Sequence, residues 1–202
     1  MHGHRLAYFV ATVVASVLGH DACGEMPTTA PTNPVGPPCA FAKSTVVTLT
    51  ADNGGSLYAC SNCVKDAKDF GAFVTSMKSN TWTIQPLDGH LVALHANGFS
   101  GIGTNVLAPS MDLSPGIAEP DQVMLPFTVN GASNAHQWAC TVVGSNQIML
   151  RNIANGKYLA RCDGCDGDQI PPPDLFQPVF TLSAPHGNQT TASMVWTYAL
   201  QP

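Results

Sequence analysis

Short apolar runs separated by polar turns make up most of the chain, and the dipeptide Asn-Gly stands in the turns at residues 53–54, 97–98 and 155–156. The best-formed example lies in residues 147–165 (QIMLRNIANGKYLARCDGC), where the apolar run 148–150 precedes the turn and 157–160 follows it. Apolar, β-rich runs on either side of Asn-Gly are the strongest short-range signal for a β-hairpin. We therefore predict a hairpin here, closed by a Cys-x-x-Cys pair.

Two other stretches repeat this pattern. Residues 45–63 (TVVTLTADNGGSLYACSNC) carry the Asn-Gly turn and a Cys-x-x-Cys pair at matching places. A less regular copy begins with a strand at 91–94, turns at Asn97-Gly98 and is expected to continue through Ile102. It lacks the cysteines, and Gly103-Thr104-Asn105 stands where they would fall.

The second half of each unit is repeated as well, as an apolar run containing Phe followed by a run containing Trp. The Phe runs are 73–75, 127–129 and 180–182, and the tryptophans are Trp82, Trp138 and Trp196. The sequence separation between a tryptophan and the leucine of the next unit is 12 residues, both from Trp82 to Leu94 and from Trp138 to Leu150. We therefore predict three four-stranded repeats, at about residues 44–89, 90–145 and 146–202.

Repeats of about 40–55 residues that are rich in strands and poor in helices are compatible with only a few protein architectures. Three such units, with an aliphatic first strand and a Trp in the fourth, resemble a β-trefoil. The turn at 155–159 (NGKYL) is most similar to the fascin-like and ricin-B-like branches of that superfamily, although the Gln-x-Trp repeat of ricin-B-like lectins is absent. The resemblance covers residues 43–200. It implies an all-β fold, a closed six-stranded barrel with a hairpin cap.

The beginning of the chain is predicted to stand apart from this domain. Residues 1–5 are short and basic, and 6–18 are an unbroken run of apolar and small residues, which is typical of a secretory signal peptide over 1–22. Such a run is too short for a bilayer, which needs about 20 apolar residues. Residues 23–40 are rich in Pro and Thr and predict an extended spacer before the β-trefoil domain at 41–202.

Charge narrows the choice of partners. Only 10% of the residues are charged and the net charge is −5. No cluster of Lys and Arg is present, so nucleic acid and anionic membrane surfaces are poor candidate partners. The lack of a basic cluster and the predicted signal peptide together favour a secreted, extracellular protein.

Seven cysteines in a secreted chain indicate disulfides, with one thiol left over. Local disulfides Cys60–Cys63 and Cys162–Cys165 are favoured, each closing a hairpin. Cross-links between the two pairs, a zinc site of four cysteines and a redox role are the alternatives. Secretion argues against zinc, and the redox motif normally opens a helix. Cys39 could pair with Cys23 or with Cys140.

The sequence has no side-chain pattern typical of an enzyme. His90 and His95 flank one strand on opposite faces, and neither a nucleophile elbow nor a recognisable Ser, His and Asp spacing is present. Three carboxylates at 163–168 lack the spacing of an EF-hand loop, so a solvated acidic turn is predicted. We therefore expect a non-catalytic protein that needs neither a metal nor a cofactor.

Surface loops on a rigid barrel are the remaining place for function. Sugar sites combine amide and carboxylate groups with an aromatic ring, and three turn regions offer such groups. The candidate ligand-binding residues are Asp52, Asn53, Tyr58, Asn97, Arg151, Asn155, Tyr158, Arg161 and Asp163. We predict a lectin-like protein whose partner is an extracellular glycan or glycoprotein, itself glycosylated at the sequon of Asn188.

Two other functions fit the same pattern. A protease inhibitor of the Kunitz-like trefoil type would present one exposed loop, for which 108–121 and 167–178 are the candidates. A secreted interaction or effector protein would show neither activity. Folding explains what the three hairpins share, so a specific role of the third hairpin is expected at Arg151, Lys157, Arg161 and the acidic turn.

Overall fold

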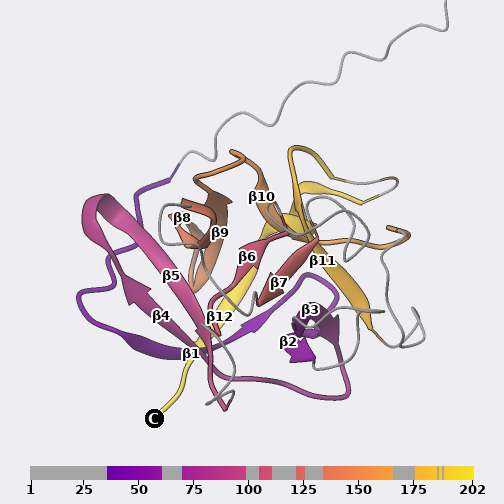
Figure 1. The fold of residues 1–202 in the computed structure, drawn as a ribbon, viewed down its shortest axis with the longest axis horizontal. Helices are drawn as coiled ribbons and strands as arrows, with labels where there is room; N and C mark the ends of the chain where they lie inside the picture. The colour runs from indigo at the N-terminus through magenta and orange to yellow at the C-terminus, as the bar shows by residue number, and fades with distance from the viewer. Residues whose placement is uncertain are drawn as a thin grey trace, which may run out of the picture.

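The computed structural model describes residues 36–60, 70–98, 105–110, 122–125, 134–165, 176–185, 187 and 189–202 (Figure 1). Twelve strands and three short 3-10 helices lie within these ranges. The strands are β1 (Thr45–Thr50), β2 (Ser56–Cys60), β3 (Phe70–Thr75), β4 (Trp82–Pro86), β5 (Leu91–Ala96), β6 (Ala108–Pro109), β7 (Val123–Leu125), β8 (Trp138–Gly144), β9 (Gln147–Asn152), β10 (Tyr158–Arg161), β11 (Gln177–Leu182) and β12 (Trp196–Leu200). The 3-10 helices are η1 (Asp88–His90), η2 (Asn134–His136) and η3 (Thr191–Met194).

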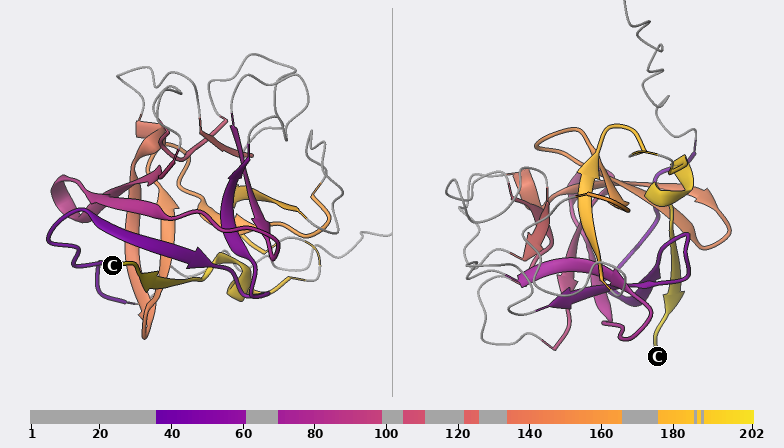
Figure 2. Two further views of the ribbon diagram at one scale, coloured as in Figure 1. Left: turned by 90° about the horizontal axis from the view of Figure 1, so that it is seen from below. Right: turned by 90° about the vertical axis from the view of Figure 1, so that its right-hand side faces the viewer.

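Six of the strands form a closed ring. Antiparallel pairing runs from β1 to β4, β5, β8, β9 and β12, and β12 then pairs with β1. Figures 1 and 2 show β12, in yellow, beside β1, in indigo, so that the last strand of the chain closes the ring. A closed ring leaves no unpaired strand edge. The predicted all-β architecture with six barrel strands is confirmed.

The other six strands form three hairpins, β2 with β3, β6 with β7 and β10 with β11. The hairpins also contact one another, because β3 pairs with both β7 and β11 and a bridge joins Gln122 to Phe180. They make up the predicted cap. Each repeat therefore contributes two strands to the ring and one hairpin to the cap.

The three tryptophans lie in the core at equivalent places. None is exposed, and each indole Nε1 donates to the carbonyl of a leucine that lies in the second strand of its own repeat or, for Leu107, directly before it. The acceptors are Leu57 at 3.1 Å, Leu107 at 3.1 Å and Leu159 at 3.0 Å. Burying the large indole stabilises the core, and the hydrogen bond satisfies its only polar group. These tryptophans pack in the core, as predicted.

The second repeat differs from the prediction in its register. The counterpart of Leu57 and Leu159 is Leu107 rather than Ile102, because a longer segment separates the Asn-Gly turn from the second strand. Ser110, which is 8% exposed, follows Leu107 at the distance at which cysteine follows leucine in the other two repeats. The predicted Phe strand 127–129 lies outside the described residues, and β7 ends before it.

The three Asn-Gly turns have the same backbone conformation. Gly54, Gly98 and Gly156 adopt φ angles of +81°, +86° and +71°. This left-handed region is readily accessible to glycine and costly for residues with a side chain. The turns follow β1, β5 and β9, the first strand of each repeat, so the local sequence fixes where the chain leaves the ring.

The end of the predicted spacer is part of the fold. A disulfide joins Cys39 to Cys140 in β8, with their Cα atoms 5.4 Å apart. Backbone hydrogen bonds run beside it, from Cys39 N to the Cys140 carbonyl at 3.0 Å and from Val142 N to the Pro37 carbonyl at 2.9 Å. Of the two pairings open to Cys39, the structure contains the one with Cys140. Residues 36–41 are called the N-terminal arm below.

Candidate functional site

Arg161, the last residue of β10, reaches the turn that follows β1. Its Nε donates to Asp52 Oδ1 at 2.7 Å and its Nη2 donates to Oδ2 at 3.0 Å, although the residues are 109 positions apart. The pairing of β11 with β3 brings the third hairpin beside the first and makes this contact possible. Two parallel hydrogen bonds to one carboxylate fix the orientation of both planar groups.

A glutamine amide supports the guanidinium from its other side. Gln177 Oε1 accepts from Arg161 Nη1 at 3.0 Å and from Asn53 Nδ2 at 2.9 Å. The Asn53 side chain in turn accepts from Gly55 N at 3.0 Å. Asp52, Asn53 and Gln177 therefore hold Arg161 in one orientation.

These groups border an open pocket of about 510 Å³, here called the Arg161 pocket. It is lined by Asp52, Arg161, Asp163, Gly164, Gly187, Gln189 and Thr190. Gln189 forms part of the wall, since its Nε2 donates to the Arg161 carbonyl at 3.0 Å and its Oε1 accepts from Asp163 N at 3.3 Å. Among the described residues, the lining side chains are polar and none is aromatic.

The ion pair controls the charge of the pocket. The hydrogen bond from Arg161 lowers the pKa of the Asp52 carboxyl below its ordinary value of 3.8, against the opposing effect of partial burial. The same hydrogen bond raises the pKa of Arg161. Asp163 is different. Its Oδ2 lies 3.9 Å from Arg161 Nη1 and its side chain is 66% exposed, so its carboxylate is open to a ligand.

Four of the nine predicted ligand-binding residues, Asp52, Asn53, Arg161 and Asp163, thus come together in and beside the Arg161 pocket. Tyr58 lies elsewhere, between the Phe176 ring, with centroids 6.2 Å apart, and the Lys78 ammonium, 5.7 Å from its own ring centroid.

The remaining four predicted residues are spread over other elements. Asn97 bonds to the hydroxyls of Thr81 and Thr83. Asn155 donates to the Thr181 hydroxyl at 2.7 Å and accepts from Lys157 N. Tyr158 is 5% exposed and packs with Met149, Ala160 and Met194, and Arg151 lies opposite it on β9.

Sequence reasoning missed Gln177, Gln189 and Thr190. The two glutamines lie in stretches that look like ordinary loops, and a neutral amide carries no spacing signal of its own. The sequon gave an indirect indication, since Gln189 and Thr190 belong to it. Asn188, its predicted glycosylated residue, lies outside the described residues.

The cysteines near the pocket form a disulfide. Cys162 is bonded to Cys165, as predicted, directly after Arg161. Cys60 is disulfide-bonded too, and its predicted partner Cys63 lies outside the described residues.

Within the described ranges, no group of three or more His, Cys, Asp or Glu side chains could hold a metal ion. The same part of the chain contains no helix with the length and apolar character needed to span a bilayer.

No known protein-family model matches the sequence, and no curated protein matches it either. Solved structures do resemble the fold. The BEL β-trefoil has a TM-score of 0.52 and 15% identity, covering 83% of this chain and 100% of that one. A proteinase inhibitor from Coprinopsis cinerea has a TM-score of 0.51 and 14% identity, covering 78% of this chain and 97% of that one. A Polyporus squamosus lectin, bound to a human-type influenza-binding epitope, has a TM-score of 0.50 and 13% identity, covering 79% of this chain and 50% of that one.

At these identities the likeness concerns the architecture alone. It agrees with the strand pairing, in which each of three repeats adds two strands to a ring and a hairpin to a cap. The chain therefore has a β-trefoil fold.

Proposed function

We propose that this chain is a secreted, non-catalytic binding protein that recognises carbohydrate in the Arg161 pocket. The observation that carries the proposal is the bidentate Arg161–Asp52 ion pair at the wall of an open, polar hollow. A guanidinium held by a carboxylate and an amide keeps its orientation without a ligand. Ligand binding then costs little ordering of the protein, which favours affinity.

The groups left open in the pocket suit sugar hydroxyls. The Asp163 carboxylate can accept from two of them, and the Thr190 hydroxyl, whose oxygen already accepts from Ala192 N, can still donate. Gly164 and Gly187 leave space at the wall, since a Cβ built on either would contact nothing within 4 Å. The described lining residues include no aromatic ring, so they would bind a ligand by hydrogen bonds rather than by stacking.

Secretion and the absence of catalysis are part of the proposal. The predicted signal peptide and the disulfides Cys39–Cys140 and Cys162–Cys165 support an oxidising, extracellular location. The β-trefoil fold suits both a lectin and a proteinase inhibitor, as the two named neighbours illustrate. It does not decide between them, because function lies in the site and not in the fold.

A glycan array that includes cell-wall polysaccharides tests the proposal. The secreted protein is applied as wild type and as Asp163→Asn, with Asp88→Asn, a carboxylate outside the pocket, as the matched control. Loss of a charged hydrogen-bond acceptor costs about 1.5–3 kcal/mol, so Asp163→Asn should weaken retention by about tenfold or more. The control should bind like wild type.

Asn188→Gln is introduced into all three proteins, so that a glycan at the predicted sequon does not compete for the neighbouring pocket. Failure of wild type on the whole array would overturn the proposal, as would equal loss in the control. Inhibition of a serine or cysteine protease panel by protein that is silent on the array would support the inhibitor alternative.

A further inference from the structure

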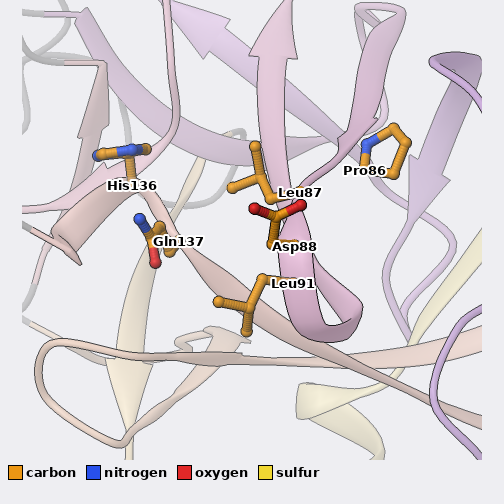
Figure 3. A pocket seen from close by; sticks show the side chains of 6 residues that line it. All are labelled: Pro86, Leu87, Asp88, Leu91, His136 and Gln137. Atoms are coloured by element: carbon orange, nitrogen blue, oxygen red, sulfur yellow. The ribbon is translucent and has the colours of Figure 1, made fainter.

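A second hollow, of about 410 Å³, lies between η1 and the beginning of β8. It is lined by Pro86, Leu87, Asp88, Leu91, His136 and Gln137, and is called the Asp88 hollow below. Figure 3 shows His136 and Gln137 on one side and the β4–β5 connection, with Leu87, Asp88 and Leu91, on the other. Its volume falls within the range usual for small-molecule sites.

The polar side chains of this hollow are not used by the fold. Within the described part of the chain, the Asp88 carboxylate and the Gln137 amide form no hydrogen bond or ion pair. His136 Nδ1 is buried without a partner. The backbone of Gln137 is fixed, however, because its N–H donates to the Asn134 carbonyl and its own carbonyl accepts from Ile153 N, both at 3.0 Å. The hollow therefore presents unused polar groups from a fixed backbone.

A smaller, apolar hollow of about 250 Å³ adjoins it and shares Pro86, Leu87 and Leu91 with it. Its other lining residues are Cys39, Ala40, Phe41, Ala42, His90 and Val92. The N-terminal arm provides one wall, and the Cys39–Cys140 disulfide holds that wall against β8. The two hollows share the wall formed by Pro86, Leu87 and Leu91, and together they are called the cleft below.

Charge selects the kind of ligand. Among the described residues of the two linings there is no Lys or Arg, and Asp88 is the only carboxylate. An anionic ligand would meet repulsion there, whereas a cation would gain an ion pair. The apolar walls at Leu87 and Leu91 favour a ligand with a hydrocarbon part over a free polyol.

We propose that this cleft binds a small organic amine. The ammonium group pairs with Asp88 and the hydrocarbon part packs on Leu87 and Leu91 toward Phe41. The Gln137 amide, which also lines the hollow, can bind a further polar substituent. This site is separate from the Arg161 pocket and requires no carbohydrate.

Titration of the secreted, disulfide-intact protein with three matched probes tests the inference. The probes are 2-phenylethylamine, 2-phenylethanol and phenylacetate, and binding is followed by the NMR shifts of the Leu87 and Leu91 methyl groups. The amine should bind best, the alcohol about fivefold more weakly, and phenylacetate not measurably, since a partly exposed ion pair is worth up to about 1 kcal/mol.

Two variants separate charge from shape. Asp88→Asn should reduce amine affinity to that of the alcohol, while Asp163→Asn, which alters only the Arg161 pocket, should leave it unchanged. Equal affinity of the amine and the alcohol for wild type would overturn the proposal, and so would unchanged amine binding in Asp88→Asn or no shift at millimolar amine. Glycan retention by Asp88→Asn is independent of these results, so failure here and failure of the carbohydrate proposal are distinguishable.

Discussion

The two polar hollows of this domain use their side chains in opposite ways. In the Arg161 pocket the guanidinium donates to the Asp52 carboxylate and to the Gln177 amide oxygen, and the Gln189 amide donates to the Arg161 backbone carbonyl. In the Asp88 hollow, Asp88 and Gln137 make no such contacts within the described ranges. The first set of groups contributes to the fold and is already oriented, whereas the second leaves its interactions to a ligand.

This difference separates stability from binding. A substitution within the Arg161 network removes hydrogen bonds that hold the first repeat to the third, so it should destabilise the protein. A substitution of Asp88 removes nothing that the fold uses. The disulfides beside the two sites differ as well, because one joins distant parts of the chain and the other spans a single turn.

The largest effect is expected from the disulfides. Replacing Cys39 and Cys140 by Ser opens a loop with a sequence separation of 101, and replacing Cys162 and Cys165 opens one with a separation of 3. Chain entropy gives a loss of about 4–5 kcal/mol for the first pair and about 2 kcal/mol for the second. Urea unfolding of both double variants measures the difference, and equal losses would contradict it.

The same pair of variants bears on ligand binding. Loss of Cys39–Cys140 should weaken amine binding, because the N-terminal arm forms one wall of the cleft, and should spare the Arg161 pocket. Loss of Cys162–Cys165 should weaken binding in the Arg161 pocket and leave amine binding unchanged.

Arg161→Met should cost about 2 kcal/mol of unfolding free energy, because it leaves the partly buried Asp52 carboxylate without its partner while keeping an apolar stem. The measurement is a double-mutant cycle with Asp52→Asn by chemical denaturation. The double variant should be about as stable as Arg161→Met alone. Additive losses from the two single variants would show that the ion pair is not a coupled unit.

Repeats and turns could be predicted from sequence because their signals are local. Asn-Gly requires a left-handed glycine wherever it reverses a hairpin, and a tryptophan of each repeat needs a buried place and an acceptor. The register error in the second repeat has the opposite cause. An insertion between Asn97-Gly98 and Leu107 moved the second strand, and nothing in the spacing marked where it resumed.

Only part of the candidate site could be predicted from the sequence. Asp52 and Arg161 were selected in separate turns as polar groups, but their pairing depends on how β11 lies against β3, which no local pattern encodes. Gln177 and Gln189 carry no charge and no periodicity. No sequence motif marks His136, and the hollow beside it lies between the β4–β5 connection and the residues just before β8, which are far apart in the sequence.

Acid should weaken the stability that the Arg161 network contributes. The pKa of Asp52 is lowered in the folded protein, so its contribution to stability is complete above 3.8, its ordinary value, and is lost as pH falls below 3.8 through the folded pKa. The stability difference between wild type and Asp52→Asn, measured by urea unfolding from pH 6 to pH 2, should be constant above about pH 5 and shrink below pH 4. A difference that stays constant to pH 2 would contradict the ion pair.

The smallest effect is expected at Asp88. Asp88→Asn should change the unfolding free energy by no more than about 0.5 kcal/mol, as for surface positions without a structural partner. Arg161→Met, measured in the same urea series, is the comparison. If Asp88→Asn destabilised the protein as much as Arg161→Met does, its carboxylate would be serving the fold. A near-zero change in stability, combined with lost amine binding, is the result that assigns Asp88 to a ligand.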